Sequence, residues 1–252
     1  MAPLVTHLVV GERVFAQLQQ FDSTAYGPFL LGCVMVDVNG FSEIDRRATH
    51  FVGRLHEDGE DAFRKSCDNF LEQLDTLLVR PWRELTQPEQ AFVAGYLCHL
   101  AVDEVSKQSG YEMLQKLGIS SLAELPVPGG ILLSAFSALT RELHGDFSTI
   151  SSALESASIP HVLTHVSHGD FRAMWAISKE WIMNGCPYRL RVEMHRRMGK
   201  TEAQIEAARR EREAHWDAAV AFAQESGEVE RTVDRGVLRS LEVLPRLWGR
   251  SV

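Results

Sequence analysis

The chain has 252 residues, of which 45% are hydrophobic and 24% are charged, a balance typical of a globular protein rather than a disordered one. At this length one domain spanning residues 1–252 is the simplest organisation, and two smaller domains are the alternative. The formal net charge of −8 argues against nonspecific wrapping of nucleic acid, because neutralising phosphates requires an excess of Lys and Arg. We therefore expect no nucleic-acid partner.

The N-terminal residues carry no Lys or Arg ahead of an apolar run, so no secretory signal is predicted. No stretch reaches the roughly 18 to 20 uninterrupted apolar residues that a membrane-spanning helix needs. The cysteines lack a Cys-x-x-Cys pair, which predicts neither a disulfide framework nor a thiolate zinc site. The sequence therefore predicts a cytoplasmic protein with four reduced thiols, at Cys33, Cys67, Cys98 and Cys186.

Apolar residues recur at helical spacing in several long stretches, and strand-like alternation is nearly absent, so an all-α fold is predicted. A first helix is expected over residues 6–18. An apolar run over residues 29–36 ends at Asp37, just before Asn39 and Gly40, which favour a turn. Residues 59–79 form a clear amphipathic pattern that Pro81 ends.

Thr86 and Glu89 have the spacing of a capping box with Pro88 in the first turn, so a long helix is expected from residue 86 to about Gln108. Residues 126–130, Pro-Val-Pro-Gly-Gly, are the most loop-like segment and are interpreted as a hinge or boundary. Further helices are expected over residues 131–143, 161–184, 202–225 and 229–243.

Two polar residues interrupt the apolar centre of the predicted helix 86–108. His99 and Asp103 are spaced i,i+4, so their side chains lie on one helix face, about 5 to 6 Å apart at Cβ. Burying an unpaired imidazole and carboxylate is unfavourable, and one divalent cation would offset that penalty for both. A buried hydrogen bond between His99 and Asp103 is the alternative that needs no metal.

Three further residues place a possible metal ligand beside apolar neighbours. They are His7 in Val5-Thr6-His7-Leu8, Asp37 after Val34-Met35-Val36, and His50 before Phe51. Imidazole nitrogens and carboxylate oxygens are common zinc ligands. The candidate metal-binding set therefore consists of His7, Asp37, His50, His99 and Asp103.

These motifs, in this order, give the sequence a resemblance to a known family. The N-terminal Thr-His, the Asp that closes the Gly-rich apolar segment Gly32 to Asp37, the Thr-His-Phe and the Gly-Tyr-Leu-x-His-x-x-x-Asp lie within residues 1–105. The sequence resembles the intracellular bacterial branch of the zinc-dependent phospholipase C family, a helical superfamily that also contains the zinc-dependent single-strand nucleases. The resemblance implies that Asp37, His50, His99 and Asp103 surround one zinc. It also implies that Asp103 bridges to a second zinc held by His7, with the chain's N-terminus as a further candidate ligand.

The resemblance implies a phospholipase C-like hydrolase that uses one or two zinc ions, or another divalent metal, on a small-molecule or lipid-like phosphoester. Asp37 would also act as the general base. Residues 1–125 would form the metal-bearing half, and residues 131–252 would pack against it and complete the pocket. Two alternatives stay open: a helical binding or scaffold protein with a structural or degenerate metal site, and the same scaffold recruited to another metal-assisted biosynthetic reaction.

The sequence departs from the three-zinc members of this family after Asp103, because no further histidine occurs before His144. We therefore expect at most two metals. His161, His165 and His168 have i,i+4,i+7 spacing in the predicted helix 161–184, and they are interpreted either as a substitute site or as surface histidines.

Overall fold

The computed structural model describes residues 2–40, 44–51, 65–120, 124–167, 169–170, 172–176, 192–193, 195–196 and 199–249. Within these residues the fold is all-α, as predicted, and the one β-type contact is an isolated antiparallel bridge between Leu78 and Leu163.

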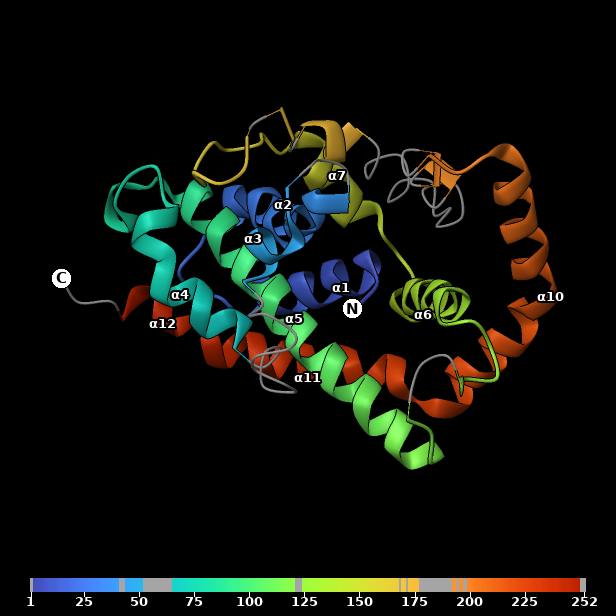
Figure 1. The fold of residues 1–252 in the computed structure, drawn as a ribbon. Coiled ribbons are helices and arrows are strands. Elements are labelled where there is room, and N and C mark those ends of the chain that lie inside the picture. Colours follow the sequence, from blue (N-terminus) through green and yellow to red (C-terminus); the bar gives the residue numbers. More distant parts are fainter. Residues whose placement is uncertain are drawn as a thin grey trace.

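The long helix α5 (Gln87–Leu117) crosses the molecule diagonally, and the other elements pack around it (Figure 1). In chain order they are α1 (Leu4–Phe15), η1 (Ser23–Ala25), α2 (Tyr26–Met35), η2 (Val36–Gly40), α3 (Arg46–His50), α4 (Ser66–Leu77), η4 (Trp82–Glu84), α6 (Gly129–His144), α7 (Ser148–Ser156), α10 (Glu202–Ser226), α11 (Glu228–Val243) and α12 (Pro245–Trp248).

Helix α5 begins at the predicted capping box, in which the Thr86 main-chain N–H donates to the Glu89 carboxylate at 2.8 Å. Its predicted end near Gln108 is wrong, because the helix continues through Gly110 and stops at Gly118. Gly118 has a φ of 68°, the left-handed conformation that favours glycine. Tertiary packing explains the extension, since the added turns bury Met113 in an apolar cluster with α6 and α10.

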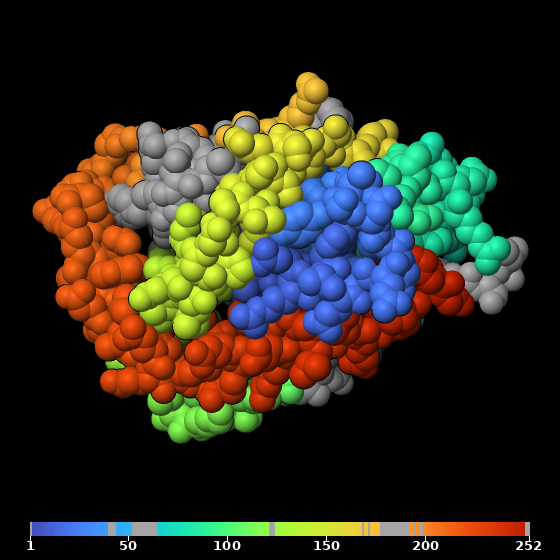
Figure 2. Space-filling view, turned by 180° about the vertical axis from the view of Figure 1, so that it is seen from behind, coloured from blue at the N-terminus to red at the C-terminus, as the bar shows by residue number. Residues whose placement is uncertain are grey.

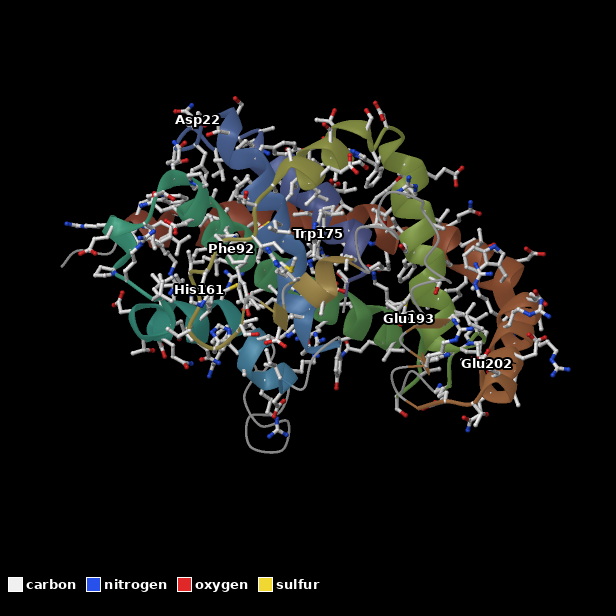
Figure 3. All side chains as sticks on the ribbon, turned by 90° about the horizontal axis from the view of Figure 1, so that it is seen from above. Asp22, Phe92, His161, Trp175, Glu193 and Glu202 are labelled. Carbon is white, nitrogen blue, oxygen red and sulfur yellow. The ribbon has the colours of Figure 1, made fainter. Side chains whose placement is uncertain are left out.

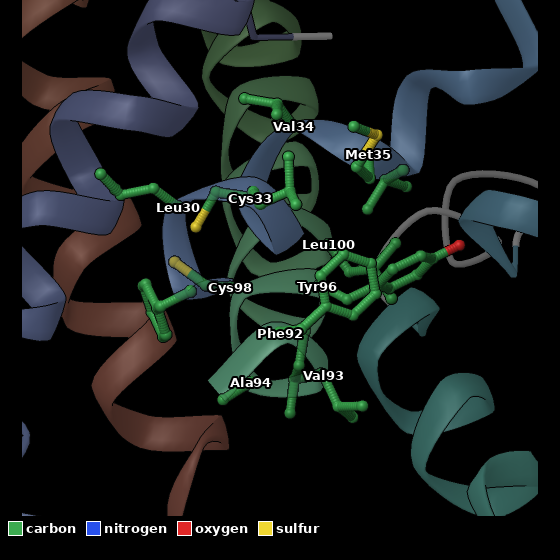
Figure 4. Close-up of a cluster of buried hydrophobic side chains, with 14 of the residues drawn as sticks. Leu30, Cys33, Val34, Met35, Phe92, Val93, Ala94, Tyr96, Cys98 and Leu100 are labelled. Atoms are coloured by element: carbon green, nitrogen blue, oxygen red, sulfur yellow. The ribbon is translucent and has the colours of Figure 1, made fainter. Parts of the chain in front are cut away.

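Helices α2 and α5 cross with their backbones in close contact, and two glycines make this possible. A Cβ added at Gly32 would lie 2.1 Å from the main-chain oxygen of Phe92, and one added at Gly95 would lie 1.9 Å from that of Phe29. Apolar side chains of both helices fill the space around this crossing, including the facing thiols of Cys33 and Cys98 (Figure 4). The carbonyls at the end of α2 are thereby held against the middle of α5.

Helices from the second half of the chain pack against different parts of the first half, α11 against α5, α6 against α1 and α7 against α2. Helix α11 runs beside α5, with Arg239 Nε donating to Glu104 Oε2 at 3.0 Å and Arg235 donating to Glu112 at 2.8 Å. Helix α10 starts at Glu202 on the outer edge of the molecule (Figure 3). Seen from behind, α6 lies between α10 and α1, with α11 running below all three (Figure 2). Helices α5, α6, α10 and α11, with the segment before α6, form the apolar cluster of Met113, Leu125, Val127, Ile131, Leu132, Ala135, Leu139, Ala219, Ala223 and Val229.

The predicted helix 161–184 is wrong over its first turns. Residues 161–167 are not helical, and Val79 N–H donates to the Val162 carbonyl at 3.1 Å, which aligns this segment beside the end of α4. Helical residues follow only after Ser167, whose hydroxyl accepts from the Asp170 N–H at 3.1 Å in a capping arrangement. Residues 177–184 lie outside the described residues, as do residues 59–64 of the predicted helix 59–79.

The described cysteines Cys33, Cys67 and Cys98 are buried free thiols, as predicted, and Cys186 lies outside the described residues. In the part of the chain that the structure describes, no helix is both long enough and apolar enough to cross a membrane.

Candidate metal centre

The structure brings all five predicted ligands together from four elements. His7 lies on α1, Asp37 on η2, His50 at the end of α3, and His99 and Asp103 on α5. They form two overlapping groups, one of His7, His99 and Asp103 and the other of Asp37, His50 and His99. Within each group the potential ligand atoms all lie within 4.8 Å of one another. His99 belongs to both groups and is therefore the centre of the cluster, which we call the five-residue centre.

His99 is oriented by a single hydrogen bond. Its Nδ1 lies 2.7 Å from the main-chain oxygen of Cys33, and because a carbonyl only accepts, Nδ1 carries the proton. Cys33 is in the last turn of α2, where carbonyls have no partner within the helix. Nε2 of His99 is buried and has no hydrogen-bond partner among the described residues, which excludes the predicted alternative of a His99–Asp103 hydrogen bond.

His7 lies flat against His99, with ring centroids 3.7 Å apart and an interplanar angle of 2°. Neither ring nitrogen has a hydrogen-bond partner in the described structure, although Nε2 lies 3.7 Å from Asp103 Oδ1. Burial, followed by the proximity of His99, lowers the pKa of His7 to about 3. Burial also lowers the pKa of His99. Both rings are therefore neutral at pH 7, the form in which imidazole binds a metal.

Asp37 is the candidate ligand whose side chain reaches the surface. Its side chain is 27% exposed, whereas those of His7, His50 and Asp103 are at most 2% exposed. Its Oδ1 accepts from His50 Nε2 at 3.2 Å, and His50 Nδ1 lies 2.8 Å from the Thr49 hydroxyl. Burial raises the pKa of Asp37, but the hydrogen bond from His50 and the nearby His99 outweigh it and hold that pKa well below its usual range.

Asp103 presents each oxygen to a different histidine. Oδ1 faces His7 Nε2 and Oδ2 faces His50 Nε2, both at 3.7 Å. The main-chain N–H of Ala2 also donates to Oδ1 at 3.3 Å, so the start of the chain reaches the centre. Burial raises the pKa of Asp103, but its neighbours, His99 foremost, bring the pKa below the usual value.

Arg46 is part of the site and was not found from the sequence. Its guanidinium donates to Asp103 Oδ2 at 3.1 Å and to Asp37 Oδ1 at 3.5 Å, and the side chain is 31% exposed. Lys107, one turn after Asp103, also lowers the pKa of that carboxyl. Both residues lie four positions from a candidate ligand on a helix, since Arg46 precedes His50 and Lys107 follows Asp103. That spacing is the signal that could have found them.

The histidines of segment 161–167 do not join the centre. His161 is exposed, and the segment is not helical, which removes the predicted i,i+4 face. His165 packs edge-on against Phe51 and Tyr96, with ring centroids 5.7 and 6.3 Å away. Burial lowers the pKa of His165 to about 4. His168 lies outside the described residues.

Comparisons of the chain with protein-family models, with curated proteins and with solved structures found no match. Inferences about function therefore depend on the residues of the centre themselves.

Proposed function

We propose that the chain is a metal-dependent hydrolase of phosphoesters that uses one or two zinc ions. The observation that carries this proposal is the pair of ligand groups that share His99. Buried ring nitrogens without partners are unfavourable in a protein interior, and the centre places those of His7 and His99 beside the carboxylate of Asp103. A divalent cation would satisfy all three at once, and this donor set of imidazoles and carboxylates suits zinc.

The donor atoms also favour a particular distribution of the five residues between two metal ions. His99 has one nitrogen left for a metal, because Nδ1 is engaged by Cys33, so it serves a single ion. Asp103 has two oxygens directed at different histidines, which suits a bridging carboxylate. His7 and Asp103 would then hold one ion, Asp37, His50 and Asp103 would hold the other, and His99 would complete one of the two sets.

A divalent metal at such a centre lowers the pKa of a coordinated water to about 7 and stabilises charge on phosphoryl oxygens. The exposed side of the centre carries Asp37 and Arg46, so substrate would approach there. Arg46 now pairs with two carboxylates, and once cations neutralise these, its planar guanidinium is suited to bind two phosphoryl oxygens. Asp37 would orient the attacking water and accept its proton.

The test has two parts, metal content and hydrolysis. Protein purified without chelator should contain one or two zinc ions per chain by elemental analysis, and His99→Ala should lower both metal content and melting temperature. A panel of phosphodiesters and phosphomonoesters, assayed with added zinc, should include a substrate. Absence of metal, together with a melting temperature unaffected by chelator, would contradict the metal centre. Bound metal with no hydrolysis across the panel would contradict the activity and favour a structural metal site.

A further inference from the structure

Two histidines of the five-residue centre hold their ring protons in different ways. Nδ1 of His99 faces the Cys33 carbonyl at 2.7 Å, so its proton is fixed there and Nε2 is left without one. His50 Nε2 instead lies 3.2 Å from Asp37 Oδ1, and His50 Nδ1 lies 2.8 Å from the Thr49 hydroxyl. A carboxylate only accepts hydrogen bonds, so in this arrangement Nε2 of His50 carries a proton.

That proton occupies the nitrogen that His50 would offer to a metal. Nε2 is the atom that faces the carboxylates, at 3.2 Å from Asp37 and 3.7 Å from Asp103, and histidine binds a metal only through an unprotonated nitrogen. To become a ligand, His50 must therefore carry its proton on Nδ1 instead. Nε2 gives its proton to water and Nδ1 takes one from water, so the charge of the ring does not change. Nδ1 then requires an acceptor.

The Thr49 hydroxyl is able to be either donor or acceptor to His50 Nδ1. While Nε2 holds the ring proton, the hydroxyl donates to Nδ1. Once Nδ1 holds it, the hydroxyl accepts and turns its own hydrogen to the main-chain carbonyl of Arg46, whose oxygen lies 3.2 Å away. Asn39 Oδ1, at 3.5 Å, is a second and more distant acceptor. Only the hydroxyl hydrogen has to rotate.

The main chain on both sides of His50 is held by other helices. The Tyr96 hydroxyl on α5 donates to the Thr49 carbonyl at 2.5 Å, and Asn69 Nδ2 on α4 donates to the Phe51 carbonyl at 2.8 Å. Thr49 is 0% exposed and His50 is 1% exposed. Water therefore does not reach Nδ1 from the surface, and the ring is not free to turn towards another acceptor.

We propose that Thr49 is a positioning residue for the metal centre, which sets the nitrogen of His50 that carries the proton. Its hydroxyl donates to Nδ1 when no metal is bound and accepts from Nδ1 when His50 is a ligand. His99 needs no such partner, because a carbonyl already fixes its proton in the metal-binding form. The inference rests on the metal centre of the proposed function, and it does not depend on the hydrolysis of any substrate.

The position of the ring protons can be measured directly on the full-length protein. Long-range proton–nitrogen NMR spectra of protein labelled with ¹⁵N-histidine distinguish the two neutral forms, and His50→Gln identifies the His50 signals. At about pH 8, where an ordinary imidazole is neutral, we expect the His50 proton on Nε2 in chelator-treated protein and on Nδ1 after saturation with zinc chloride. The His99 proton should stay on Nδ1 throughout. A His50 proton on Nδ1 in the chelator-treated protein, or on Nε2 in the zinc-saturated protein, would overturn the reversal.

Variants of Thr49 test whether the hydroxyl matters for metal binding. Thr49→Val has a similar shape but no hydroxyl, so competition with a chromogenic chelator should show zinc bound at least about tenfold more weakly, as for other partners of metal-binding histidines. Thr49→Ser keeps the hydroxyl and should bind zinc as the wild type does. Thr140→Val is the matched control, because the Thr140 hydroxyl is also buried and donates to a carbonyl of its own helix, at 2.8 Å, but contacts no candidate ligand.

The outcomes separate this inference from the proposed function. Far-ultraviolet circular dichroism checks that each variant is folded, and if Thr49→Val does not fold, the ring protons of the wild type and the zinc affinity of Thr49→Ser decide. Wild-type zinc affinity in folded Thr49→Val, or an affinity in Thr49→Ser reduced as much as in Thr49→Val, would overturn the role of Thr49 and leave the metal centre intact. Absence of zinc binding in the wild type would overturn both.

Discussion

Nδ1 of His99 donates a 2.7 Å hydrogen bond to the main-chain carbonyl of Cys33, so a side chain at the middle of α5 is held by the last turn of α2. This bond requires the two helix backbones to lie in close contact, which Gly32 and Gly95 allow. A group that orients a metal-binding histidine from behind fixes both its tautomer and its direction. The orientation of His99 therefore depends on the packing of α2 against α5 at Gly32 and Gly95.

Gly95→Ala tests this dependence. The new methyl group would lie 1.9 Å from the Phe29 carbonyl oxygen, so α2 and α5 must separate, and we expect a loss of more than about 3 kcal/mol of unfolding free energy together with weaker metal retention. Gly110→Ala, on the same helix but in open space, is the matched control and should be neutral or stabilising by up to about 1 kcal/mol. Urea denaturation measures both variants. Similar stabilities for the two would show that the close contact is unimportant.

Arg46 provides a test of substrate binding. Within the proposed function, Arg46→Ala should raise KM for a phosphoester by at least about tenfold, because a charge-assisted bidentate contact is lost, while the metal content changes little. Arg47→Ala is the control, since Arg47 is the exposed neighbour on the same short helix and lies outside the centre. Steady-state kinetics and elemental analysis on both variants give the result. A fall in kcat with no change in KM would contradict a role in substrate binding.

His165, which is not one of the candidate metal ligands, gives a prediction about the pH dependence of stability. Burial lowers the pKa of His165 to about 4, whereas its pKa in the unfolded chain is close to the ordinary histidine value of 6.5, so the unfolded state binds the proton more readily between these values. The stability is therefore full above about pH 6.5 and is lost as the pH falls towards 4. In His165→Phe this loss should be smaller by roughly 1 to 2 kcal/mol, allowing for partial solvent exposure of the ring.

Urea denaturation of wild type and His165→Phe at pH 7 and pH 4.5 isolates this effect, because all other titrating groups are shared. His161→Phe, a substitution at an exposed position on the same segment, is the control and should lose about as much stability between pH 7 and pH 4.5 as the wild type. If the free energy of unfolding falls equally from pH 7 to pH 4.5 in wild type and His165→Phe, His165 does not contribute to the loss of stability at acid pH.

Local signals in the sequence were sufficient for much of the fold. The capping box at Thr86 and Glu89 located the start of α5, and the apolar run before Asp37 located the end of α2. The end of α5 could not be predicted in this way, because Gly110 and Gly118 offer two possible stops and packing of Met113 on α6 decides between them. In the segment after residue 160, periodicity was misleading because main-chain pairing with the end of α4 overrides it.

In the five-residue centre, too, local sequence predicts some features and tertiary packing decides the others. His7, His99 and Asp103 interrupt apolar runs, Asp37 ends one and His50 precedes Phe51, so residue type and neighbours were enough to select all five as candidates. The spacing of Arg46 four residues before His50 places it next to that candidate ligand, but its pairing with Asp37 and Asp103 depends on how α3 lies relative to η2 and α5, which the spacing does not encode. The stacking of His7 on His99 likewise results from α1 lying against α5.

Asp37 and Asp103 should respond differently to the same change from carboxylate to amide. Asp37 is partly exposed and contacts His50, whereas Asp103 is buried and its oxygens face two histidines. Under the proposed function, Asp37→Asn keeps an oxygen ligand but cannot accept a proton, so it should retain most of its metal and lose at least about tenfold in kcat, within the usual 10²- to 10⁴-fold contribution of a general base. Asp103→Asn should lose metal first, because an amide has one oxygen and cannot bridge two ions as a carboxylate does. Elemental analysis and kinetics at saturating zinc separate the two outcomes. Equal loss of metal in both variants would contradict the bridging role of Asp103, and full activity of Asp37→Asn would contradict its role as the base.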